Sequence, residues 1–85
     1  MYKKTGTIQI TNDLSLKDFT WKTGKVSYEI GTDNIADVEV IMWENYRKHS
    51  RTFPCHMTTD NWQDSDVIVA LLEMEPFKDS VEVAQ

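Results

Sequence analysis

The chain has 85 residues, of which 40% are hydrophobic and 27% charged, and its formal net charge is −5. This length predicts one domain, residues 1–85, with a small core, and the composition excludes a disordered chain. No apolar run approaches the roughly 20 residues that cross a bilayer, and the first residues lack the apolar centre of a signal peptide. Because Cys55 is the one cysteine, no internal disulfide can form, and we expect a reducing, cytoplasmic setting without membrane association.

The charge is unevenly distributed along the chain. Residues 1–25 hold five lysines and two aspartates, a net charge of +3, whereas residues 52–85 hold Lys78 and seven acids, a net charge of −6. An acidic segment of this kind repels the phosphates of nucleic acids and attracts basic protein surfaces. We therefore expect a basic protein as partner and disfavour a nucleic acid.

The first predicted element is a strand in TGTIQIT, because Ile8 and Ile10 alternate there with polar residues. Asn12 is a turn former that predicts its end. Residues 18–31 then predict a hairpin that turns at Thr23–Gly24, since glycine adopts positive φ without a steric penalty.

Residues 34–49 predict the helix of the fold. Apolar residues recur there every three or four positions, Asp33 or Asn34 can cap the first turn, and bases dominate the last turn. The β-branched residues of DVEVIMW oppose a helix. If residues 37–44 form a strand instead, the alternative architecture is an all-β barrel or sandwich.

The last third predicts strands. RTFPCHM predicts a short edge strand, because proline has no amide hydrogen to donate. DVIVALLEME is apolar on both sides at its start and predicts a central strand, and SVEVA predicts a final short one. The predicted fold class is therefore α+β, an antiparallel sheet of five or six strands with the helix packed on a face.

The spacing of the candidate catalytic and metal-binding residues does not match that of a catalytic or metal site. Cys55 and His56 are neighbours, and neighbours on a strand point to opposite faces, so the imidazole cannot activate the thiol. Paired zinc ligands do not occur, and the acidic stretch TTDNWQDSD lacks the glycine and the glutamate of a calcium loop. We therefore expect no enzymatic activity, no metal and no cofactor, and Cys55 is expected to be a small buried apolar residue.

The tryptophan in the acidic stretch TTDNWQDSD is the feature from which a function is predicted. A tryptophan surrounded by carboxylates, as in TTDNWQDSD, is typical of an interface anchor that is steered onto a basic partner. We therefore expect a non-enzymatic protein-binding module, an inhibitor or accessory protein of the kind that phages and mobile elements encode, with a nucleic-acid enzyme as one candidate partner. The predicted partner-binding residues are Asp60, Trp62, Asp64, Asp66, Glu73, Glu75 and Trp43.

Two alternatives stay open. One is a structural subunit of a homo-oligomer or viral particle that associates through strand edges and tryptophans. The other is single-stranded nucleic-acid binding by a basic, aromatic sheet face. Its residues would be Lys3, Lys4, Lys17, Lys22, Lys25, Phe19, Trp21 and Tyr28. Against this, Phe19 and Trp21 lie on the same side of one strand and are expected in the core.

Overall fold

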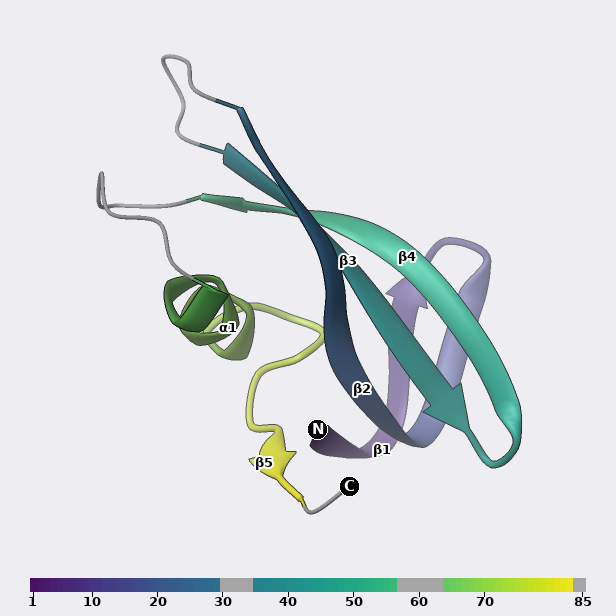
Figure 1. Cartoon of the computed structure of the whole chain (residues 1–85). Helices are drawn as coiled ribbons and strands as arrows, with labels where there is room; N and C mark the ends of the chain where they lie inside the picture. Colours follow the sequence, from purple (N-terminus) through teal and green to yellow (C-terminus); the bar gives the residue numbers. More distant parts are fainter. Residues whose placement is uncertain (30–34, 57–63, 84–85) are drawn as a thin grey trace.

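An open antiparallel sheet with one short helix at its side makes up the computed structural model, which describes residues 1–29, 35–56 and 64–83 (Figure 1). The order of strands across the sheet is β4-β3-β2-β1-β5. The elements are β1 (Tyr2–Thr11), β2 (Leu14–Glu29), β3 (Ile35–Glu44), β4 (Arg47–His56), α1 (Asp64–Leu72) and β5 (Val81–Glu82). Five antiparallel strands and one helix fit the predicted α+β class, although the helix lies elsewhere in the sequence.

The predicted helix over 34–49 is wrong, because β3 and β4 occupy its described part and form a hairpin. Along β3, Val38 and Met42 are fully buried, as are their alternate neighbours, while the residues between them are half-buried. This period of two belongs to a strand. Residues four positions apart lie on one side of a strand as well as on one side of a helix, so the helical spacing was ambiguous. Pairing with β2 on one side and β4 on the other selects the strand.

The predicted central strand in 67–74 is also wrong, because α1 covers most of it. Val67 and Leu71, four positions apart, are fully buried on the same side of the helix, and Val69 on another side is 55% exposed. A helix of nine residues is marginal by itself, so its stability comes from this packing against the sheet.

The predicted hairpin turn at Thr23–Gly24 is a third error. Strand β2 runs through these residues for 16 positions, and its register with β3 shifts between Thr23 and Val26. Such a shift is a β-bulge, which often contains glycine. A Cβ at Gly24 would meet Oε1 of Glu39, the end of a side chain on β3, so here glycine leaves room for that carboxylate rather than making a turn.

Several local predictions are confirmed. The alternating segment around Ile8 lies in β1, and residues 12 and 13 form the turn to β2. RTFPCHM falls largely in β4, which is an edge strand of the sheet, and SVEVA contains β5, the strand at the other edge. β4 is longer than predicted, at ten residues.

The sheet is curled, so that its β1–β2 turn approaches the edge strand β4. The evidence is the ion pair between Oδ2 of Asp13 in that turn and Nη2 of Arg51 in β4, at 3.4 Å, although two strands separate β4 from β1 in the sheet. We call the concave side, which carries Trp21 and Met42, the core face, and the opposite side the outer face. The core residues from all four long strands, α1 and the following segment form one hydrophobic cluster.

Aromatic rings join the segment after α1 to the sheet. The ring of Phe77 lies 4.8 Å from that of Trp21 in β2 and 5.0 Å from that of Phe53 in β4, measured between centroids. Tyr2 of β1 also stacks on Trp21, at 4.8 Å between centroids. The indole Nε1 of Trp21 donates a hydrogen bond of 3.0 Å to Oγ of Ser80, so the polar atom of this buried ring is satisfied.

This arrangement predicts that Phe77→Ala lowers the free energy of unfolding much more than a substitution of the exposed Val81 does. Phe77 is fully buried between two strands, and removing such a ring costs about 3–5 kcal/mol because a cavity remains. Val81→Ala is the control, since Val81 is exposed and should change stability by less than about 0.5 kcal/mol. Urea unfolding measures both; a loss below about 1 kcal/mol for Phe77→Ala would contradict the role assigned to this ring.

Candidate functional site

The predicted partner-binding acids lie on or just after α1, as far as they are described. Asp60 and Trp62 lie outside the described residues, and so does the side chain of Asp64. Asp66 is half-buried on α1, and Glu73 and Glu75 are exposed in the turns that follow it. The acids with described side chains thus lie near the C-terminal end of the chain.

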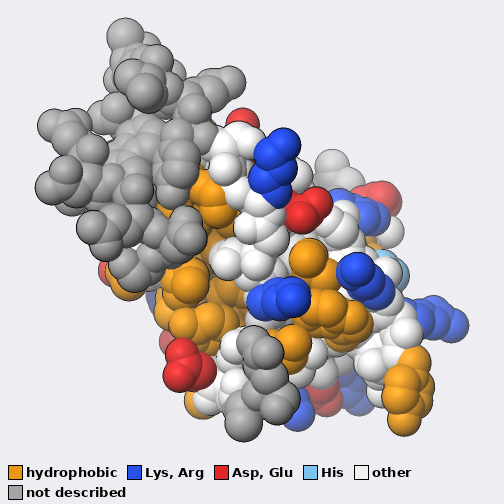
Figure 2. Space-filling model, viewed as in Figure 1, with side chains coloured by type: hydrophobic (Ala, Val, Ile, Leu, Met, Phe, Trp, Pro, Cys, Tyr) orange, Lys and Arg blue, Asp and Glu red, His pale blue; other side chains and the backbone are white. Residues whose placement is uncertain are grey.

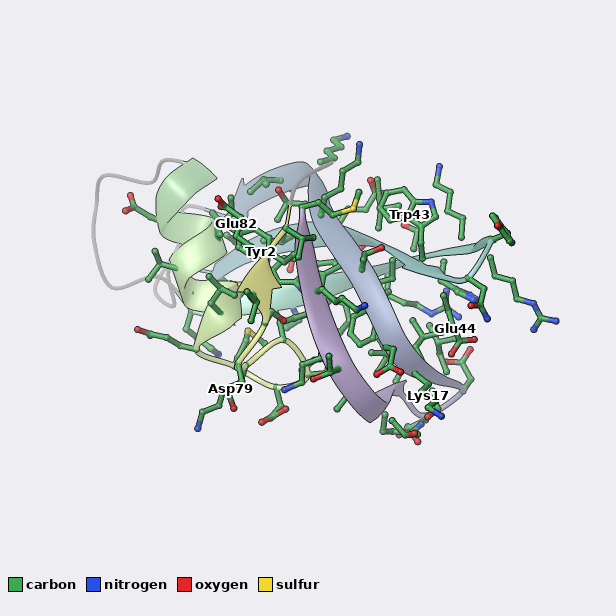
Figure 3. The ribbon with its side chains drawn as sticks, turned by 90° about the horizontal axis from the view of Figure 1, so that it is seen from below. Tyr2, Lys17, Trp43, Glu44, Asp79 and Glu82 are labelled. Atoms are coloured by element: carbon green, nitrogen blue, oxygen red, sulfur yellow. The ribbon has the colours of Figure 1, made fainter. Side chains whose placement is uncertain are left out.

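Trp43 lies apart from these acids. It is the ninth residue of β3, opposite Thr20 and Lys48, on the outer face. The acids approach the sheet near Pro54, which is paired with Asp37, six residues earlier on β3. Six strand residues span about 20 Å, so Trp43 and the acids belong to two different surfaces. In Figure 3, two other acids of the C-terminal segment, Asp79 and Glu82, lie on the side of the molecule that carries α1, whereas Trp43 and Lys17 lie away from it.

A pocket of about 220 Å³ lies where the edge strand β4 meets α1. Ala70 and Met74, four positions apart, are half-buried in it, whereas the carboxylate-bearing Glu73 is exposed. Its lining residues are Pro54, His56, Ala70, Glu73 and Met74. Pockets for drug-sized ligands are typically about 300–1,000 Å³, so this one is smaller than most of them.

The sequence did not predict this pocket, because Ala70 and Met74 were assigned to a strand that would place Glu73 on the opposite side. Only a helix brings residues 70, 73 and 74 onto adjoining positions. The pocket also needs β4 beside that helix, which no local signal indicates.

The segment that begins with α1 is strongly acidic. Residues 64–83 contain six aspartates or glutamates, and Lys78 is the one basic residue among them. One of these acids, Glu82, acts on the side chain of Tyr2. Burial raises the pKa of Tyr2 above its usual value, and the charge of Glu82 and a hydrogen bond to it raise it further. The rest of the chain, which forms the four long strands, carries nearly balanced charges. The excess negative charge therefore belongs to the C-terminal segment.

Cys55 is buried, as the sequence predicted, and it does not face His56. Its side chain is 1% exposed on the core face, with Sγ 3.9 Å from Sδ of Met74, whereas His56 is exposed on the outer face. Burial raises the pKa of the Cys55 thiol, and the nearby charge of Asp37 raises it further. The thiol therefore stays protonated near neutral pH, which is unsuited to a nucleophile.

Two further findings concern the described part of the chain. No three His, Cys, Asp or Glu side chains within it lie close enough together to hold a metal ion. Within the same residues, no helix has the length and apolar character needed to span a bilayer.

The raised pKa of Cys55 predicts a loss of stability at alkaline pH. Above about pH 8.5 the thiol of the unfolded chain ionises while the buried thiol does not, so the free energy of unfolding falls as the pH rises toward the folded-state value. Cys55→Ala should reduce this fall between about pH 8.5 and 9.5. Tyr2→Phe is the control, because an unfolded tyrosine titrates near pH 10. Urea unfolding across this range tests it, and equal slopes for wild type and Cys55→Ala would contradict it.

Comparisons with known proteins identify no relative of this chain. No protein-family model matches it, and neither does any curated protein or solved structure.

Proposed function

We propose that the chain is a non-enzymatic binding module that docks its acidic C-terminal end on a basic surface of another protein. The observation that carries this proposal is the pocket between β4 and α1, where Glu73 stands beside the half-buried Ala70 and Met74. An apolar pocket with a carboxylate at its edge fits one cationic side chain of a partner.

An arginine of the partner matches this pocket better than an aliphatic residue does. Its methylene stem can lie against Ala70 and Met74, while its guanidinium reaches the Glu73 carboxylate in a charge-assisted hydrogen bond. Arginine is among the residues that most often dominate binding energy at protein interfaces. Val69, one helical turn before Glu73 and 55% exposed, offers apolar contact beside the pocket.

The remaining acids act over a longer range. Glu75 and Asp79 are exposed and lie within a few residues of Glu73. Exposed carboxylates contribute little to the affinity one by one, but together they accelerate and orient the encounter with a basic surface. Binding should therefore weaken as salt is added.

A defined peptide tests the proposal. The probe is a basic peptide with one central arginine, and its matched counterpart carries uncharged citrulline at that position. Titrated into the ¹⁵N-labelled full chain, the arginine peptide should shift the amide signals of Ala70, Glu73 and Met74, and the citrulline peptide should bind more weakly. Glu73→Gln should weaken binding by at least about fivefold.

Two further variants sharpen this test. Ala70→Phe fills the pocket and should abolish the arginine-dependent shifts, whereas Glu39→Gln removes the same charge as Glu73→Gln on the outer face and should leave the affinity within about twofold. Undiminished binding by Ala70→Phe, or shifts that spread away from α1, would refute docking at this pocket.

A further inference from the structure

A row of paired residues crosses the outer face through all five strands. Because directly opposite residues of an antiparallel pair point to the same side of the sheet, the register defines its members. They are Val81 of β5, Lys3 of β1, Thr20 of β2, Trp43 of β3 and Lys48 of β4. This row places one tryptophan between two lysines on a solvent-facing surface.

A third lysine reaches the same ring. Lys22, which is exposed on β2 two residues after Thr20, has its Nζ 5.8 Å from the centre of the Trp43 ring, within the range of a cation–π contact. Trp43 itself is half-buried. Figure 2 shows this face toward the viewer, with a hydrophobic patch near its middle bordered by Lys and Arg side chains. We call Lys3, Lys22, Trp43 and Lys48 the lysine–tryptophan patch.

The carboxylates nearest this patch have backbone partners or lie further along the strands, and Asp18, two residues before Thr20 on β2, accepts a hydrogen bond of 2.7 Å from the amide of Gly6. No carboxylate occurs among the five paired residues of the row. Glu44, next to Trp43 in sequence, accepts a hydrogen bond of 2.6 Å from the amide of Lys17. On the outer face of β3, Glu39 and Asp37 lie four and six residues before Trp43, which corresponds to about 13 and 20 Å along the strand.

The local charge of the lysine–tryptophan patch differs in sign from the net charge of the chain. The acids that follow α1 approach the sheet near Pro54, about 20 Å along the strands from Trp43, whereas Glu82 of β5 lies closer, one strand from Lys3 on the core side. Charges more than a Debye length apart, about 10 Å at 0.1 M salt, are largely screened from one another. The patch therefore presents a local positive potential around an aromatic ring, although the chain as a whole is acidic.

We propose that the lysine–tryptophan patch binds single-stranded nucleic acid, with a base stacked on Trp43 and phosphates contacted by Lys3, Lys22 and Lys48. Sites for single-stranded nucleic acids combine an aromatic ring with cationic side chains along the path of the backbone. The ring can stack on any base, and the cations contact the negatively charged phosphates. Strands about 4.8 Å apart set Lys3 and Lys48 roughly 14 Å from each other across the ring. This is a second site, separate from the pocket between β4 and α1.

The adjoining hairpin offers a second ring. Tyr46, in the two-residue loop between β3 and β4, is completely exposed, and Asn45 before it has a φ of 56°, a conformation that asparagine tolerates better than most residues. A single-stranded nucleic acid whose base stacks on Trp43 and whose chain continues toward this loop would reach Tyr46 next. Arg47 follows Tyr46 directly and adds a further cation.

The test is fluorescence anisotropy of the full chain with a labelled mixed-sequence single-stranded oligonucleotide of about 12 nucleotides. Wild type should bind at about 50 mM salt and lose affinity steeply by about 200 mM. Trp43→Ala should weaken binding by about 5- to 100-fold, and Trp43→Phe, which keeps a ring, should recover most of it.

The lysines are tested by the salt dependence rather than by affinity alone. Lys22→Gln and Lys48→Gln should each reduce the slope of log K against log salt by about 0.7, the value for one phosphate contact with a single strand. Lys78→Gln removes the same charge from the C-terminal segment and should leave the slope unchanged. Ala70→Phe, which fills the other site, should also bind the oligonucleotide as wild type does.

Specific outcomes would overturn the proposal. One is the absence of oligonucleotide binding by wild type at low salt, and another is equal affinity of wild type and Trp43→Ala in samples that urea unfolding shows to be folded. If poly-glutamate competes as well as the oligonucleotide, the patch binds an acidic protein instead. If sedimentation shows a dimer that Trp43→Ala dissociates, the patch is covered by a second copy of the chain.

Discussion

The contact of Phe77 with Trp21 and Phe53 is the interaction on which the other features depend. A curled sheet of four long strands leaves its concave side open at one end, and Phe77 enters there between β2 and β4, at 4.8 and 5.0 Å from the two rings. The same segment supplies the Ser80 hydroxyl that accepts the buried indole hydrogen of Trp21. With Phe77 in place, α1 lies against β4, and the pocket between them exists.

Segregation of charge follows from the same architecture. The strands alternate between an apolar side, which the core requires, and a polar side, so lysines distant in sequence gather on the outer face. The acids of residues 64–83 belong to the segment that closes the core, and two of them, Asp79 and Glu82, lie on the side of the molecule that carries α1 (Figure 3). One small chain thus presents two surfaces of opposite sign, and the two proposed sites use one each.

Local sequence patterns predicted the elements whose signals agree with one another. Ile8 alternates with polar residues in β1, and a two-residue polar turn follows it. Phe19 and Trp21 were expected to share the core side of one strand, and both are fully buried. Cys55 was expected to be a small buried apolar residue, and it is. Each of these predictions depends on neighbours within a few positions, where the geometry of a strand or turn is set by the residues themselves.

The helix was misplaced where local signals conflict. Residues 34–49 combine a helical spacing with β-branched residues, and the apolar stretch at 67–74 fits a buried strand or a buried helix equally well. Neither conflict can be resolved within the segment, because pairing of β3 with two neighbouring strands and burial of Val67 and Leu71 against the sheet decide the outcome. Tertiary packing regularly overrides propensities of this size.

By itself, the sequence determined the alternating strand around Ile8, the acidic C-terminal third and the burial of Cys55, since each of these follows from composition or from short-range periodicity. The α+β class was also expected, but from a helix over 34–49 that the structure replaces with two strands. Only the tertiary structure decided which segment became the helix and which side chains meet. The row from Lys3 through Trp43 to Lys48 joins residues up to 45 positions apart, and the pocket joins Pro54 to Met74. Such neighbours are set by strand register and by the closing of the core, which depend on contacts between segments that are distant in the chain.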